Sequence, residues 1–131
     1  IMQEWTFLFS MMMDKLCKIR DIQRLVNQYE IEFEKLHGLC LNEGMALCSL
    51  TKKHKLSSGE LSETLGLTHS NTSKVIASVE RKGYVERVIG QEDKRHMYFT
   101  ITAKGREALE RIHKKELEIP DALDNLISGT K

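Results

Sequence analysis

The chain has 131 residues, of which 40% are hydrophobic and 30% charged, and its formal net charge is +1 at pH 7. This length can bury the core of one domain, and no apolar run approaches the roughly 18 residues of a membrane span. The opening residues lack the basic segment of a signal peptide. Cys17, Cys40 and Cys48 show no CxxC spacing, which argues against a disulfide framework or a zinc site and favours a reducing, cytoplasmic compartment.

A long amphipathic helix is predicted over residues 4–36. Apolar side chains recur there at steps of three or four residues, and charged side chains fill the opposite face. A helix of this length extends beyond what one small core can cover. We therefore expect its end to pack against a second subunit, the alternative being a long core helix. The apolar positions are Leu8, Met12, Leu16, Ile19, Ile22, Val26, Tyr29, Phe33 and Leu36.

Three shorter helices are predicted next, each from a capping residue. Asn42 is expected to cap a helix over residues 43–54. Ser57 or Ser58 is expected to cap a helix that Gly66 ends, and Glu60 completes a capping box with Ser57. Thr68 caps a helix that runs to about residue 82. The expected core positions are Met45, Leu47, Cys48, Leu50, Leu61, Leu65, Val75, Ile76 and Val79.

A β-hairpin and two further helices complete the prediction. Residues 84–88 and 97–101 alternate as strands do, and the polar segment 89–96 between them forms the turn. Thr102 is expected to cap a helix through about Leu117, and a short helix is expected near residues 121–127, beyond Pro120. The predicted fold class is mainly α with a small β-hairpin (α+β), in the order of a winged helix-turn-helix.

This order of elements is a DNA-reading arrangement. The second helix of a helix-turn-helix lies in the major groove, so its first turns should be short and polar. Hydroxyls and amides approach base edges closely, Asn pairs two ways with adenine, and the free N–H groups of a helix N-terminus bind phosphate. The recognition residues predicted on this basis are His69, Ser70, Asn71, Thr72, Ser73 and Lys74.

The hairpin tip supplies a second predicted contact, the wing. Arg95 is placed to enter a narrow minor groove, Asp93 to orient it, and Lys94 to touch phosphate. Positive charge gathers in this part of the chain, since residues 68–115 hold 11 Lys/Arg and 6 Asp/Glu, a net +5. Each residue alone has an ordinary structural explanation, for instance an ion pair of Arg87 with Glu86 or Glu92. The order of the elements taken together favours DNA binding. Contacts to the DNA backbone are predicted for Ser58, Arg81, Lys82 and Arg87.

Residues 39–112 resemble the MarR family of bacterial transcriptional regulators. The specific parts are the segments 61–67 (LSETLGL) and 79–87 (VERKGYVER), then 92–95 (EDKR) followed by 101–105 (ITAKG). The last two are similar to the family's D-x-R wing and its L-T-x-x-G, with Ile101 in place of Leu. Together these segments are specific, whereas a helix-turn-helix alone would be weak.

The resemblance implies a homodimer with one winged domain per subunit. The single domain, 1–131, would then consist of dimerisation helices over residues 1–38 and 103–131 and a winged helix-turn-helix over residues 39–102. The family also implies binding to a near-palindromic DNA operator, usually as a repressor. Members often release DNA when a small phenolic or lipophilic effector enters the crevice between the dimer helices and the winged domain.

Two alternatives stay open. A branch of the family senses hydroperoxides through a cysteine in the first helix, where Cys17 lies; the partner tyrosine position near Leu41 lacks a hydroxyl, so a structural role for Cys17 is favoured. Winged helices also serve as protein-interaction modules without DNA binding.

No HExxH, GxSxG, P-loop or GxGxxG motif occurs. The sequence therefore predicts no enzyme, no cofactor, no metal site and no membrane association.

Overall fold

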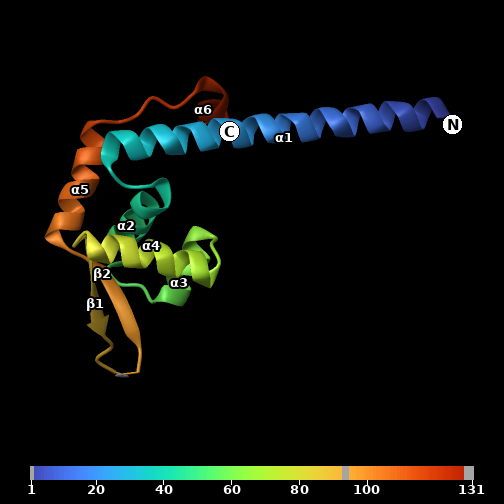
Figure 1. The fold of residues 1–131 in the computed structure, drawn as a ribbon. Coiled ribbons are helices and arrows are strands. Elements are labelled where there is room, and N and C mark those ends of the chain that lie inside the picture. The colour runs from blue at the N-terminus through green and yellow to red at the C-terminus, as the bar shows by residue number, and fades with distance from the viewer. Residues whose placement is uncertain (1, 93–94, 129–131) are drawn as a thin grey trace. The chain divides into compact units, whose positions relative to one another are not determined.

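The computed structural model describes residues 2–92 and 95–128, which form the helices and the hairpin that the sequence predicts (Figure 1). The mainly α fold with one antiparallel hairpin is thereby confirmed as a winged helix-turn-helix. Several ends differ by a few residues from expectation: for example, the second helix begins at Leu41, the first strand begins at Val85 rather than Tyr84, and the helix after the hairpin ends at Lys114. The elements are α1 (Met2–His37), α2 (Leu41–Lys53), α3 (Ser58–Leu65), α4 (His69–Arg81), β1 (Val85–Ile89), β2 (Met97–Ile101), α5 (Ala103–Lys114) and α6 (Asp121–Ser128).

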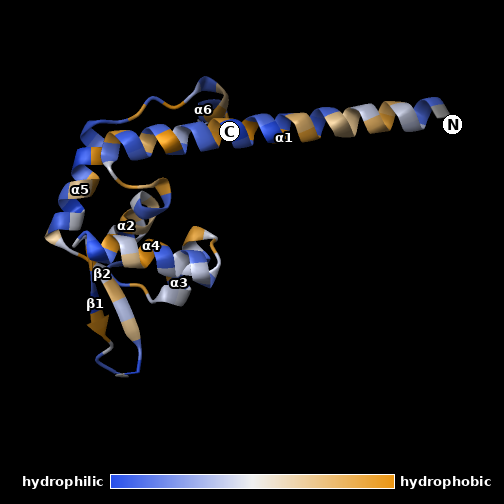
Figure 2. Cartoon of the chain, in the orientation of Figure 1, coloured by the Kyte–Doolittle hydropathy of each residue, from blue (hydrophilic) through white to orange (hydrophobic). Residues whose placement is uncertain are grey.

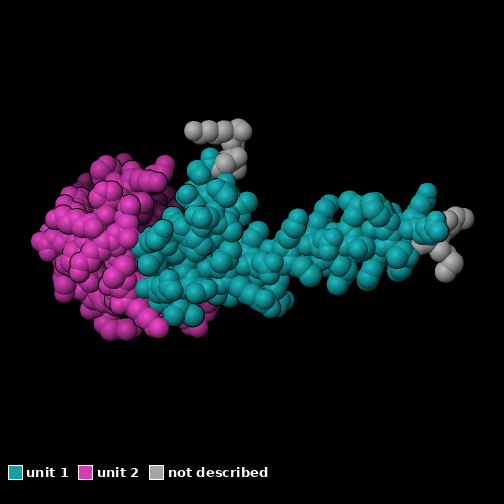
Figure 3. Space-filling view, turned by 90° about the horizontal axis from the view of Figure 1, so that it is seen from above, with its two compact units in different colours: residues 1–32, 117–131 teal, residues 33–116 magenta. Residues whose placement is uncertain are grey.

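The chain divides into two compact units (Figure 3). One unit covers residues 33–116 and holds the winged helix-turn-helix, from the last turn of α1 to the end of α5. The other covers residues 1–32 and 117–131 and holds most of α1 together with α6. Within the described ranges, no helix has both the length and the apolar character needed to cross a membrane.

The core of the 33–116 unit lies where α2, α3 and α4 meet the hairpin. Most of the expected core positions are buried, which confirms the helical spacing. Met45 and Cys48 are exposed instead, and Leu65 is only half-buried, so these three expectations were wrong. The core cluster is Leu47, Leu50, Leu56, Leu61, Ile76, Val79, Val85, Phe99 and Ile101.

Three of the four predicted helix caps are confirmed. The Ser57 hydroxyl accepts from the Glu60 N–H at 3.2 Å while Glu60 Oε1 accepts from the Ser57 N–H at 3.0 Å, a reciprocal capping box. Thr68 and Thr102 cap α4 and α5 through their hydroxyls. Asn42 does not cap α2, because that helix begins at Leu41 and Cys40 is the residue before it.

The hairpin is joined to the helices at its base and along one edge. Val85 pairs with Ile101 and Ile89 with Met97, and Leu56 adds a bridge to Phe99 on the other side of β2. The Thr102 hydroxyl donates to the Gly83 carbonyl at 2.7 Å. A Cβ at Gly105 would collide with the Tyr84 carbonyl, so the T-x-x-G pattern has a steric cause: only glycine lets α5 start this close to the hairpin.

The 1–32 part of α1 exposes large apolar side chains over several turns (Figure 2). Trp5 and Phe9 stack on one another, with ring centroids 5.4 Å apart. Four positions of the predicted apolar face, Leu8, Met12, Leu16 and Ile19, are between 52% and 62% exposed. Apolar surface of this extent on a helix is typical of a face that another chain covers.

Candidate nucleic-acid interface

The first turns of α4 present polar side chains to solvent, as predicted. The Thr68 hydroxyl accepts the Asn71 N–H at 3.1 Å and starts the helix, while Val75, Ile76 and Val79 bury its opposite face in the core. The helix is thus fixed from behind and polar in front. The predicted recognition residues that are exposed are His69, Ser70, Asn71, Ser73 and Lys74.

Thr72 does not share this exposure, which argues against its predicted contact with DNA. The side chain is 1% exposed. Its hydroxyl accepts from Ser62 Oγ at 2.9 Å and donates to the Thr68 carbonyl at 2.8 Å. Buried hydroxyls need such partners, and the Ser62–Thr72 bond joins α3 to α4 across the turn. Sequence reasoning missed Ser62, a buried polar residue next to Leu61 in α3 that the local pattern alone could have flagged.

The wing is described only in part. Arg95 is exposed near the tip, as predicted, and the hairpin closes below it through the bond from the Gly90 N–H to the His96 carbonyl at 2.8 Å. Asp93 and Lys94 lie outside the described residues, so the predicted Asp93–Arg95 pair and the predicted Lys94 phosphate contact stay predictions.

The predicted backbone contacts fall into two groups. Ser58 and Arg81 are exposed, whereas Lys82 and Arg87 are engaged within the protein. Arg87 binds both oxygens of Glu80, at 2.7 and 3.2 Å, and not Glu86 or Glu92. Hydrogen bonds to that carboxylate raise the pKa of the Arg87 guanidinium. The Arg87 side chain is still 56% exposed and lines a cavity of about 330 Å³ with Ser58, Ser73, Ile76, Ala77, Met97 and Phe99.

Lys82 is held by a buried carboxylate, which the sequence did not indicate. Its Nζ lies 2.8 Å from Glu43 Oε2 and 3.2 Å from the Gly38 carbonyl. This ammonium joins the end of α4 to the start of α2, which argues against the predicted contact of Lys82 with the DNA backbone; that contact stays a prediction. Glu43 also accepts the Ser78 hydroxyl at 2.9 Å and the Cys40 N–H at 3.0 Å.

The pKa of Glu43 reflects these bonds. Burial by itself raises the pKa of this carboxyl, but the Cys40 N–H, Lys82 and Ser78 all stabilise the carboxylate, and the net effect lowers the pKa below its ordinary value. The folded protein thus stabilises the charged form of Glu43.

A second cavity lies between the end of α1 and α5, inside the 33–116 unit. It measures about 210 Å³. His37 Nε2 is buried without a hydrogen-bond partner among the described residues, and burial followed by the nearby Lys115 lowers the pKa of His37. The cavity is lined by Leu36, His37, Leu39, Ala108, Arg111, Ile112 and Lys115.

The cysteines and the metal-ligating side chains form no further site in the described part of the chain. Cys17 and Cys48 are exposed and Cys40 is half-buried, all three as free thiols. Burial raises the pKa of the Cys40 thiol. Among the described residues, no group of three or more His, Cys, Asp or Glu side chains could hold a metal ion.

Helix α4 has exposed polar side chains on its first turns and a buried apolar face, and the hairpin carries an arginine near its tip. These features place the chain in the class of winged helix-turn-helix DNA-binding domains. A family model described as a winged helix DNA-binding domain matches residues 43–119, more than half of the chain. The chain therefore belongs to the winged helix DNA-binding domain family.

Its relatives are transcriptional regulators. The HTH-type transcriptional regulator PapX of Escherichia coli is 29% identical over 52% of the chain and 42% of PapX. The transcriptional repressor MprA of Escherichia coli is 27% identical over 79% of the chain and 58% of MprA. The chain thus spans about half the length of these curated relatives.

The structural comparison agrees with the MarR resemblance at the level of the fold. A MarR family transcriptional regulator from Streptomyces coelicolor, in complex with DNA, has a TM-score of 0.68 and 24% identity, covering 75% of the chain and 65% of that protein. The resemblance drawn from the wing and the T-x-x-G segment is confirmed in this respect.

Proposed function

We propose that this protein is a sequence-specific DNA-binding transcriptional regulator that acts as a homodimer on a near-palindromic operator. The observation that carries the proposal is the exposed polar front of α4, fixed from behind by a buried apolar face, in a winged helix domain with Arg95 near the hairpin tip. Side chains of this kind read base edges in the major groove, while an arginine on a wing suits the minor groove.

The dimer follows from the apolar face of α1. Leu8, Met12, Leu16 and Ile19 recur at helical spacing and stand exposed. A second copy of the same helix would cover this surface, and two-fold symmetry would place two α4 helices on half-sites about one helical turn apart. The protein would then act on chromosomal DNA in the cytoplasm and would have no catalytic activity. It would repress transcription, as the name of its relative, the transcriptional repressor MprA, states for that protein.

A small phenolic or lipophilic effector would find a place in the 210 Å³ cavity between the end of α1 and α5. Its apolar lining suits a ring, and Arg111 and Lys115 at the same cavity suit an acidic substituent. A fluorescence titration of the DNA complex with a phenolic carboxylate would test this part. Release of DNA by wild-type protein but not by an Ala108→Phe variant supports the cavity as the site, and equal release by both contradicts it.

The principal test is a DNA-binding titration over a salt series. Binding to a labelled duplex should strengthen as salt falls, because phosphate contacts release counterions. Genomic fragments selected by the protein should share a near-palindromic sequence. Absence of binding even at the lowest salt would favour the alternative of a protein-interaction module.

The redox alternative needs a separate measurement. If Cys17 is a sensor, peroxide should weaken DNA binding and Cys17→Ser should abolish that response. Unchanged affinity in both experiments would exclude redox sensing and leave the ligand-responsive or constitutive regulator.

A further inference from the structure

A basic run at the end of α2 takes no part in the interface described so far. Lys52, Lys53, His54 and Lys55 are all exposed. The chain leaves α2 at His54 with φ of 66°, a left-handed conformation that no other described non-glycine residue adopts. This turn directs the following residue toward the hairpin.

Lys55 lies against the wing. The next residue, Leu56, forms two backbone hydrogen bonds with Phe99 of β2. The Leu56 N–H donates to the Phe99 carbonyl at 3.1 Å, and the Phe99 N–H donates to the Leu56 carbonyl at 2.8 Å. Lys55 Nζ stands 4.9 Å from the centre of the Tyr98 ring, a cation–π contact that holds the ammonium beside β2 while leaving it exposed.

The two faces of the hairpin carry different side chains. Successive side chains of a strand point to opposite faces, so Tyr98 lies on the face away from Phe99. Phe99 pairs with Arg87, and their face looks onto the cavity that also holds Ser58 and Ser73. Lys55 and Tyr98 belong to the outer face.

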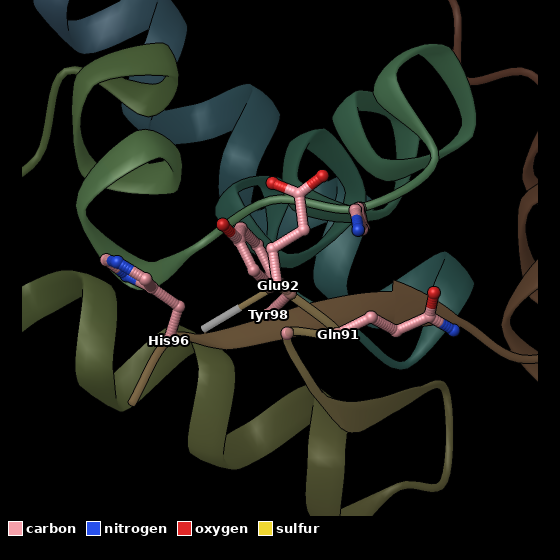
Figure 4. A pocket seen from close by; sticks show the side chains of 6 residues that line it. Gln91, Glu92, His96 and Tyr98 are labelled. Carbon is pink, nitrogen blue, oxygen red and sulfur yellow. The ribbon is translucent and has the colours of Figure 1, made fainter. Parts of the chain in front are cut away.

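The outer face carries a cavity of its own, of about 420 Å³ (Figure 4). In the close-up, Glu92 and Tyr98 lie between His96 on one side and Gln91 on the other. The lining is polar, and Lys55 is its fixed cation. Its residues are Lys55, Gly90, Gln91, Glu92, His96 and Tyr98.

We propose that Lys55 binds a backbone phosphate of duplex DNA on the outer face of the wing. A hairpin inserted into a minor groove about 6 Å wide is flanked by a phosphate strand on each side, so a wing gains from polar contacts on both faces. Ser58, Ser73 and Arg87 line the cavity on the inner face, and Lys55 serves the outer one. The inference rests on the proposed DNA-binding function.

Glu92 gives this assignment an internal check. Its carboxylate lines the same cavity and would repel the phosphate that Lys55 attracts. Removal of the two opposite charges should therefore change DNA affinity in opposite directions.

The experiment is an anisotropy titration with a fluorescein-labelled duplex of about 30 base pairs, three helical turns. A mixed sequence suffices, because phosphate contacts are sequence-independent. Lys55→Met keeps the apolar stem on Tyr98 and removes the charge. It should lower the salt slope by about one, so that the loss of affinity between about 50 and about 200 mM salt becomes roughly threefold to fourfold smaller. Lys55→Arg should restore the slope, and Glu92→Gln should tighten binding.

The matched control is Lys114→Met, which removes an exposed cation from the last turn of α5. Circular dichroism melting identifies any variant that fails to fold, and Lys55→Arg keeps the test decisive in that case. A Lys55→Met slope equal to that of Lys114→Met, with wild-type binding intact, would overturn the inference alone. Absence of wild-type binding at every salt concentration would instead overturn the proposed function.

Discussion

Glu43 and Lys82 form an ion pair of 2.8 Å that joins the start of α2 to the end of α4. The carboxylate is almost fully buried, and the ammonium also holds the Gly38 carbonyl just after α1. The C-terminal end of α4 is thereby anchored to α2 and to the loop that follows α1, while its N-terminal turns remain exposed.

Replacement of Lys82 by methionine should destabilise the fold without changing the salt dependence of DNA binding. It leaves a buried carboxylate without its counter-ion. The cost should be roughly 1–2 kcal/mol, below the range of about 3–5 kcal/mol for a fully buried pair, because a third of the Lys82 side chain is exposed. Urea unfolding measures the free energy, with Lys114→Met as control. A reduced salt slope with unchanged stability would restore Lys82 as a phosphate contact.

Acid should remove the contribution of Glu43 to stability. Its pKa in the folded protein is lowered from 4.5, so the unfolded chain takes up the proton first. The stabilisation is full above about pH 4.5 and is lost as pH falls through the lowered folded value. The difference in unfolding free energy between wild type and Glu43→Gln should therefore shrink between neutral pH and about pH 3.

Glu60→Gln is the matched control for that experiment. The pKa of Glu60 is also lowered, chiefly by the Ser57 N–H, but this carboxyl lies in solvent. Its variant should show the same sign of pH dependence with a smaller amplitude. A Glu43→Gln difference that grows as pH falls would contradict the role assigned to the buried carboxylate.

Thr72 and Asn71 should separate stability from DNA reading. Thr72→Val removes the hydroxyl that joins Ser62 to the Thr68 carbonyl and should cost about 1–2 kcal/mol of unfolding free energy. It should leave sequence preference unchanged. Asn71→Ala should do the reverse, since its side chain is exposed in front of α4. Selection of bound sequences from a random pool, beside thermal melting, checks both; a changed preference for Thr72→Val alone would refute the assignment.

The residues that the sequence predicted well are those with a local signal. The caps at Ser57, Thr68 and Thr102 satisfy N–H groups three residues away, so a short pattern reveals them. Thr72 was misplaced although its spacing to Val75, Ile76 and Val79 puts it on the buried stripe of α4. Its small polar side chain suggested exposure, and the periodicity carried the better information.

Glu43 shows what the sequence could not supply. Its partners Ser78 and Lys82 lie 35 and 39 residues away, and nothing in the local pattern links them. Asn42 was predicted as the cap because asparagine is a preferred N-cap residue, and the sequence did not show the tertiary contacts of Glu43. The contacts of Lys82 were hidden for the same reason.

Arg95→Ala should weaken DNA binding by about 1–3 kcal/mol if this guanidinium enters a groove. Arg106→Ala removes an exposed arginine from the first turn of α5 and serves as control. The loss should be greatest on duplexes with A·T-rich segments beside the half-sites, where the minor groove is narrow. Equal affinities for the two variants would refute the assignment of Arg95 to the minor groove.

The apolar face of α1 should determine the oligomeric state. Leu16 is 52% exposed on a helix whose neighbouring turns expose Met12 and Ile19 as well. A lysine at position 16 would place a charge in the centre of the proposed contact between two α1 helices, where it lacks a partner. Leu16→Lys should therefore convert a dimer into a monomer in analytical ultracentrifugation, and DNA affinity should fall because one half-site at a time is bound. Arg24→Ala, a change on the opposite side of the same helix, should leave both unchanged. A Leu16→Lys protein that stays dimeric with full affinity would place the subunit contact elsewhere on the chain.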